Sequence, residues 1–180
     1  MKRRFGRPTL AIAVILAIAL SCLGLSTARA MDYASQLIDT YYRVQDEVLF
    51  PTEMGRHYID LYYYFSNETW QISLAHPRIM NDAWQIFNDF EPPLRALVEG
   101  KGGEVSVTEE MVNQVEGFLD LLHQYAGPEF QTTIQLERSR IPLSSLVGLS
   151  FDEGRLLLLG PPEANPPGAP PTRMPMPILQ

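Results

Sequence analysis

His57, Asp60 and Tyr64 are the residues of this sequence best placed for chemistry, because they carry an imidazole, a carboxylate and a phenol at helical spacing. Asp60 follows His57 by three residues and Tyr64 follows Asp60 by four, so on an α-helix the three side chains share one face. An exposed phenol ring beside polar groups suits contact with a glycan or a peptide. We therefore expect His57, Asp60 and Tyr64 to form a binding surface. The structural alternative is a solvated, salt-linked helix face under an amphipathic tyrosine ring.

Three consecutive tyrosines in this segment should differ in burial. Successive residues of an α-helix diverge by about 100°, so the rings at positions 62, 63 and 64 cannot share one core. Tyr62 lies on the same arc as Tyr58 and Phe65 and is predicted to be buried. Tyr63 lies on a flank, and Tyr64 is predicted to be the most exposed of the three.

The sequence lacks the usual signatures of metal, cofactor and nucleophile sites. His57, His76 and His123 are 19 and 47 residues apart, and none belongs to an H-x-x-x-H pair that would place two zinc ligands on one helix face. Its acidic pairs lack the alternating Asp, Asn and Gly of a calcium loop. G-x-S-x-G, Walker and G-x-G-x-x-G patterns are also missing. We expect no metal, no cofactor and no catalytic residue.

The first 30 residues have the order of a secretory signal peptide. A basic segment (1–7) precedes an apolar run (10–20), and Ala28 and Ala30 match the A-x-A cleavage pattern. We expect cleavage after Ala30. One alternative is an uncleaved N-terminal helix that tethers the protein to a membrane, although this run is shorter than the roughly 20 residues of a spanning helix. Lipidation at Cys22 is a second alternative.

The charge of the remaining chain limits its partners. Residues 31–180 hold nine Lys and Arg against 21 Asp and Glu, a formal charge of −12, and no cysteine. Such a charge repels nucleic acid and anionic lipid, so we expect no nucleic-acid partner and no stable membrane insertion after cleavage. An exported domain without disulfides is typical of bacteria. Asn67 begins a formal N-glycosylation triplet, whose use depends on the host.

Apolar residues recur every three or four positions from Tyr33 to Ile141, which predicts an all-α fold. We expect a compact bundle of about five to seven short helices in residues 31–142. Thr52 and Ser66 are predicted N-caps, Pro92-Pro93 a helix start, and Ser106, with Thr108 as the alternative, the cap of a later helix. The predicted helices are 34–49, 53–65, 66–74, 78–90, 92–100, 106–125 and 128–138.

The rest of the chain divides into three parts. Glycines predict a hinge near residues 100–105. Residues 143–159 are apolar but interrupted by Gly148 and Gly154, and they fit a helix, a hairpin or a docking segment. Residues 160–180 hold eight prolines and are predicted to form a disordered tail.

A pattern between Asp46 and Ser66 resembles a known family. Asp46-x-x-Leu49, Gly55-Arg56 and Tyr58-x-x-x-Tyr62-Tyr63-x-x-Ser66 are similar to R-D-x-x-L and G-R-x-F-x-x-x-Y-Y-x-x-S-P in the helical segment of the bacterial CFI-box C-terminal domain. Gln45 and Asn67 depart from that pattern, and the Cys-Phe-Ile box is missing. The resemblance implies a helical accessory domain of exported bacterial proteins and no known catalytic residue.

Together these observations predict an exported, non-catalytic helical accessory or interaction domain. It would be secreted, periplasmic or on the cell surface, and its partner would be a protein or a glycan outside the cell. The alternative is a secreted hydrolase of unrecognised type that acts on a glycan or a peptide, because missing motifs do not exclude serine hydrolysis.

Overall fold

The computed structural model describes residues 28–164, 166 and 168, and this part of the chain is all-α. It holds six α-helices and no β-strand, which confirms the predicted fold class. Ala28 and Ala30 lie in the first turn of α2, and the rest of the predicted signal peptide lies outside the described residues. The elements are α2 (Ala28–Arg43), the π-helix η1 (Val44–Leu49), α3 (Glu53–Ala75), α4 (Pro77–Val98), the 3-10 helix η2 (Gly102–Glu104), α5 (Glu109–Tyr125), α6 (Pro128–Arg140), the 3-10 helix η3 (Leu143–Leu146) and α7 (Phe151–Leu159).

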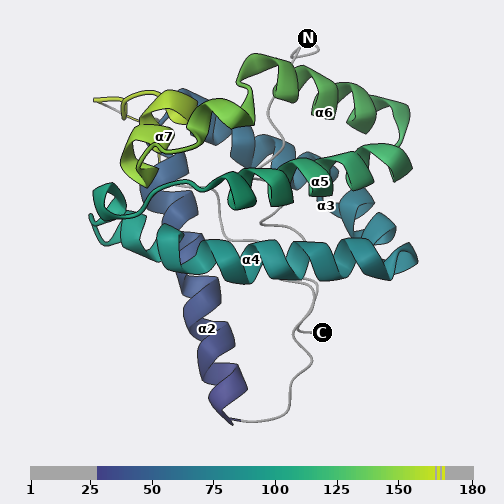
Figure 1. The fold of residues 1–180 in the computed structure, drawn as a ribbon, viewed down its shortest axis with the longest axis horizontal. Helices are drawn as coiled ribbons and strands as arrows, with labels where there is room; N and C mark the ends of the chain where they lie inside the picture. Colours follow the sequence, from purple (N-terminus) through teal and green to yellow (C-terminus); the bar gives the residue numbers. More distant parts are fainter. Residues whose placement is uncertain (1–27, 165, 167, 169–180) are drawn as a thin grey trace.

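The helices form two layers (Figure 1). α4, α5 and α6 lie side by side with alternating directions, and α2 and α3 lie behind them. α2 crosses behind α4, where Tyr41 and Phe87 stack with ring centroids 4.1 Å apart. α7 covers one end of the bundle, beside the start of α5 and the end of α4.

The helix predicted over residues 34–49 is present, but its last turn is wider than predicted. Residues from Val44 onward form a π-helix, and the backbone N–H of Phe50 bonds to the carbonyl of Gln45. The wider turn buries Val44, Gln45, Val48 and Leu49 together. Thr52 then caps α3, as predicted, because its side chain accepts a hydrogen bond from Gly55 N at 2.9 Å.

The predicted helix break at Ser66 is wrong, because α3 runs unbroken from Glu53 to Ala75. The Ser66 hydroxyl donates to the carbonyl of Tyr63 at 3.1 Å and does not cap a new helix. Phe65, Thr69 and Ile72 are all buried, so one buried stripe continues past Ser66. Packing along this stripe outweighs the weak local preference of serine for a helix end.

The predicted boundary at Pro92-Pro93 is also wrong, because both prolines lie inside α4. They cannot donate to the carbonyls of Asn88 and Asp89, which normally costs a helix about 3 kcal/mol or more. Phe87 and Glu91 are buried before this point and Pro93 itself is buried. After it, the partly buried Leu94 and Leu97 pack against the same core. The long apolar face against α2 and α5 therefore holds α4 together across the prolines.

Thr108 is the true cap of α5. Its side chain accepts a hydrogen bond from Met111 N at 3.1 Å. The prediction that placed the cap at Ser106 is wrong, because Ser106 pairs with Ser150 in an isolated β-bridge. The alternative cap was correct, and α5 ends at Tyr125, as predicted.

The segment between α4 and α5 is tied to the segment before α7. Gly100 turns the chain with a positive φ of 74°, and Val107 N bonds to Leu149 O at 2.8 Å. α7 then begins with a capping box formed by Ser150 and Glu153. Residues 143–159, for which the sequence left a helix, a hairpin or a docking segment open, form two short helices. Motion at the predicted hinge near residues 100–105 stays a prediction.

The first residues of the predicted tail contact the bundle. The backbone N–H of Glu163 bonds to Pro51 O at 2.9 Å, and its carboxylate forms an ion pair with Arg56 at 2.6 Å. The prediction of a disordered tail otherwise concerns residues 165, 167 and 169–180, which lie outside the described residues.

Candidate functional site

The predicted binding residues lie on the face of α3 that runs beside α6. The exposed fraction of Tyr64 is 64 %, and its hydroxyl donates to Glu129 Oε2 of α6 at 3.2 Å. Tyr64 is therefore the most exposed of the three tyrosines, as predicted. Tyr62 was predicted to be buried but is only half-buried, whereas Tyr58 is buried. Burial of the Tyr62 hydroxyl raises its pKa to about 12.

His57 and Asp60 do not form a pair among the described residues. His57 is half-buried, and its Nε2 has no hydrogen-bond partner there. Burial, with a smaller contribution from Arg140, lowers the pKa of His57 to about 4. Asp60 is exposed, but neighbouring protein atoms partly desolvate its carboxylate and raise its pKa, against the opposing charge of Arg56. Tyr64 is therefore joined to α6 by its hydrogen bond to Glu129, and His57 is influenced by the charge of Arg140 at the end of α6.

An apolar cavity lies where α7 meets the rest of the bundle. Its volume is about 140 Å³. Its walls come from α2, η1, α4, α5, η3 and α7, so it forms where segments distant in the sequence meet. The lining residues are Tyr41, Val44, Val48, Leu49, Phe90, Leu94, Leu97, Val107, Met111, Val112, Val115, Leu143, Leu146, Phe151, Gly154, Arg155, Leu158 and Leu159.

Few polar groups face this apolar cavity. The Tyr41 hydroxyl donates to the carbonyl of Phe87 at 3.0 Å and is thereby satisfied. Arg155 is the one charged residue among the described residues that line the cavity. It is half-buried, and its guanidinium makes no hydrogen bond or ion pair with the residues the structure describes. The cavity walls are thus almost entirely apolar, and Arg155 is the one charged side chain among the described residues that form them.

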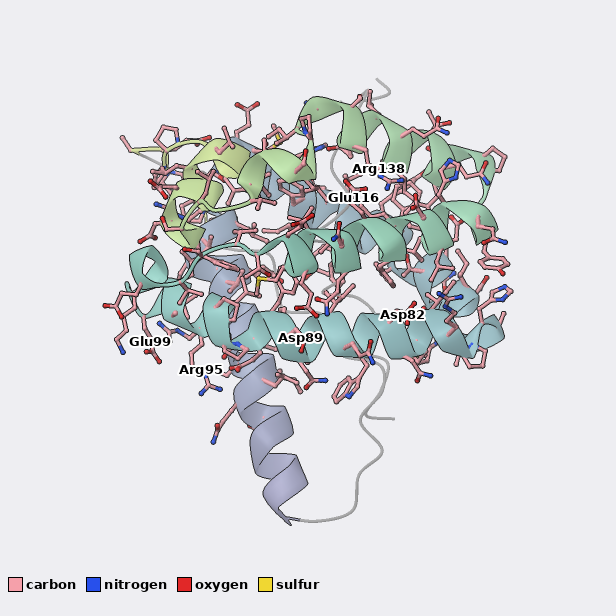
Figure 2. The ribbon with its side chains drawn as sticks, viewed as in Figure 1. Asp82, Asp89, Arg95, Glu99, Glu116 and Arg138 are labelled. Atoms are coloured by element: carbon pink, nitrogen blue, oxygen red, sulfur yellow. The ribbon has the colours of Figure 1, made fainter. Side chains whose placement is uncertain are left out.

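A second cavity, of about 240 Å³, lies between the start of α3 and the end of α6. Arg140 contacts Met54 Sδ at 3.2 Å at this place, and Glu137 is buried beside it. Arg138 also lines it and is held by Glu116 and Asp120 of α5. Figure 2 shows the Glu116 and Arg138 side chains together between α5 and α6. The arginines that line this second cavity thus mainly join neighbouring helices.

A shallow polar groove lies between α4 and α5. Asp82 and Gln114 line it, and the amide of Gln114 donates to Asp89 at 2.8 Å. Figure 2 shows Asp82 and Asp89 on α4 at this face. The Gln114–Asp89 hydrogen bond joins the two helices at the surface, whereas Asp82 pairs with Arg78 within α4.

Two further features bear on binding. Among residues 28–164, 166 and 168, no group of three or more His, Cys, Asp or Glu side chains could hold a metal ion. No helix in the same part of the chain is both long and apolar enough to cross a membrane.

The Gly-Arg pair of the CFI-box resemblance has a clear structural role. A Cβ atom on Gly55 would lie 2.0 Å from the carbonyl oxygen of Leu49, so the helix start and the end of η1 touch through backbone. The guanidinium of Arg56 donates to Phe50 O at 3.0 Å in the same corner. These two residues join η1 to α3.

Sequence reasoning missed the apolar cavity and Arg155. Val112 and Val115 of α5 line the cavity together with residues of α7, and the structure of residues 143–159 was left open by the sequence. No local pattern around Arg155 indicates that it lines a cavity.

Comparison with known proteins found no significant match: no family model, no curated protein and no solved structure is similar to this chain.

Proposed function

We propose that this protein is an exported, non-catalytic helical domain that binds a small apolar ligand in the apolar cavity under α7. The single observation that carries the proposal is a cavity of about 140 Å³ with apolar walls from six elements. An enclosed apolar cavity of about this volume in another protein takes a benzene-sized guest, and this cavity opens to solvent, so a ligand can enter it. Such a guest supplies the contacts that the cavity walls lack.

The expected affinity follows from the apolar surface that the ligand buries. A chain of six carbons gains about 0.8 kcal/mol for each buried carbon, or about 5 kcal/mol in total. This corresponds to a Kd between about 0.1 and 1 mM. A six-carbon alcohol is therefore a suitable first probe.

The lining of the cavity supports binding and not turnover. General acid-base or nucleophilic catalysis needs at least two polar groups that converge on the reacting atoms. Arg155 is the one charged lining residue in the described part of the chain, and the Tyr41 hydroxyl is engaged with the backbone. These walls provide apolar contact area and one charge.

The binding test is a titration with 1-hexanol followed by methyl NMR. We expect saturable shifts at Val112, Val115 and Leu146. Val112→Phe fills the cavity and should weaken binding at least tenfold, whereas Val147→Phe, the same change at an exposed position, should not. Gly154→Ala is the second variant, for use if Val112→Phe does not fold. It adds only a methyl group to the cavity wall, at ordinary contact distance from Leu146 and Val107, and should also weaken binding. Unsaturable shifts, or equal affinity in all variants, would contradict the proposal.

Export and lack of catalysis are tested separately. Secreted protein should begin at Met31, because the basic, apolar and A-x-A order favours cleavage after Ala30. A lipid-bearing start at Cys22, or an intact chain in membranes, would contradict this part. Turnover of any member of a panel of glycans and peptides would favour the hydrolase alternative.

A protein or glycan partner on α3 is a second candidate, supported by the 64 % exposure of Tyr64 beside exposed Asp60. It would use a different face from the apolar cavity, since neither residue lines that cavity. Tyr64→Ala should then abolish capture on a glycan or peptide array and leave hexanol binding unchanged.

A further inference from the structure

Arg155 is the one charged residue among the described residues that line the apolar cavity, and its charge bears on the kind of ligand that the cavity binds. Arg155 is on α7, one residue after Gly154, and both line the cavity. The guanidinium is half-buried and makes no hydrogen bond or ion pair with the described residues. Four other arginines that follow α2 differ, because each forms an ion pair with a carboxylate: Arg56, Arg78, Arg95 and Arg138.

We propose that the natural ligand is a monocarboxylate with an apolar tail, such as a medium-chain alkyl carboxylate, whose tail fills the cavity and whose carboxylate pairs with Arg155. This inference rests on the proposed function, since it names the ligand class of the same cavity. A planar guanidinium matches a carboxylate in shape, and both groups can share two parallel hydrogen bonds. A neutral or cationic head group would leave that match unused.

The net negative charge of the protein does not prevent this binding. The other charges of the surface are screened over about 8 to 10 Å at physiological salt. An arginine at the cavity acts at contact distance, in surroundings of lower dielectric constant than water, where the interaction is several times stronger. The local cation therefore decides the preference for the head group, and the net charge chiefly slows the approach of an anion.

The tail length follows from the cavity volume. About 140 Å³ accommodates a tail of roughly the bulk of benzene, so most of a longer chain would remain in water. We expect affinity to rise with chain length up to about six to eight carbons and then to level off.

The test compares three probes of equal tail: hexanoate, 1-hexanol and hexylammonium. Calorimetric titration of the native chain should give hexanoate about tenfold tighter than hexanol, with hexylammonium the weakest. Arg155→Gln should lower the ratio of hexanoate to hexanol affinity about tenfold. Arg78→Gln is the matched control, because it removes the same charge from an exposed side chain at the opposite end of α4, and it should leave the ratio unchanged.

The outcomes separate the two proposals. If hexanol and hexanoate bind equally, or Arg155→Gln leaves the ratio unchanged, the carboxylate inference is wrong and the apolar cavity remains a binding site. If no probe binds, the proposed function itself is wrong. A ratio that falls equally in Arg78→Gln would show a general effect of net charge and would also overturn the role of Arg155.

Discussion

The hydroxyl of Thr40 in α2 lies 3.1 Å from Oε1 of Glu91 in α4, and the two residues are buried together. Arg95, one turn further along α4, forms an ion pair with the same carboxylate oxygen. A buried carboxylate is tolerated when hydrogen bonds and a cation compensate for its loss of water. This contact joins α2 to α4 directly before the Pro92-Pro93 pair.

Glu91→Ala should therefore cost about 2 to 3 kcal/mol of the free energy of unfolding, because the Thr40 hydroxyl and Arg95 lose their shared partner. Urea denaturation measures this cost. Glu99→Ala is the control: Glu99 forms an exposed ion pair with Lys101, so its loss should cost less than about 0.5 kcal/mol. Equal costs for the two variants would show that the buried contact adds no stability.

Periodicity predicted most of this fold from the sequence because most helices carry one continuous apolar stripe. It failed at Ser66 and at Pro92-Pro93, where local residues favour a helix end but the buried stripe continues. The helix propensity of a residue is a local quantity, which costs less than about 0.7 kcal/mol for serine and about 3 kcal/mol for proline. The packing of a whole helix face exceeds both, and it depends on partners that are distant in the sequence.

The candidate site was less accessible to prediction. Exposure of Tyr64 followed from its position on the helix, since exposure depends on the angle around one axis. The contact of Tyr64 with Glu129, and the effect of the Arg140 charge on His57, depend on α6, which begins more than 60 residues later. The apolar cavity depends on α7, whose structure the apolar sequence of residues 143–159 left open.

Gly55→Ala should be strongly destabilising. The new Cβ would lie 2.0 Å from Leu49 O, a backbone atom that cannot move without opening the η1–α3 corner. We expect a cost of about 3 kcal/mol or more, measured by thermal or urea unfolding. Gly117→Ala is the matched control in the middle of α5, where nothing lies within 4 Å of the new atom. It should stabilise the protein by about 0.5 to 1 kcal/mol. A small cost at Gly55 would contradict the close approach.

Alanine substitutions at three tyrosines of α3 should follow their burial. Tyr58→Ala should cost about 3 to 5 kcal/mol, because this ring is 4 % exposed in the core. Tyr62→Ala should be intermediate, since Tyr62 is half-buried and in edge contact with Tyr63 at 4.9 Å. Tyr64→Ala should cost less than about 1 kcal/mol. Chemical denaturation of the three variants gives the ranking, and a large loss at Tyr64 would show that its face is covered.

The last prediction concerns His57 and the stability of the protein in mild acid. The pKa of His57 is about 4 in the folded protein, against 6.5 in an unfolded chain. Between these two values the unfolded state binds more protons than the folded state, so stability increases with pH. The part of the stability that depends on a neutral His57 is therefore fully present above about pH 6.5 and is lost as the pH falls towards 4.

His57→Asn removes this titration because asparagine stays neutral. Between pH 7 and pH 4.5 the native protein should lose more stability than His57→Asn, by no more than about 2 kcal/mol, because the ring is only half-buried and water weakens the effect. Burial is the larger cause of the low pKa and Arg140 the smaller, so Arg140→Gln should keep most of the pH dependence. Urea midpoints at several pH values measure all three chains. If the native protein and His57→Asn lose stability in parallel, His57 does not cause the loss in mild acid. If Arg140→Gln abolishes the difference between them, the charge of Arg140 and not burial is the main cause.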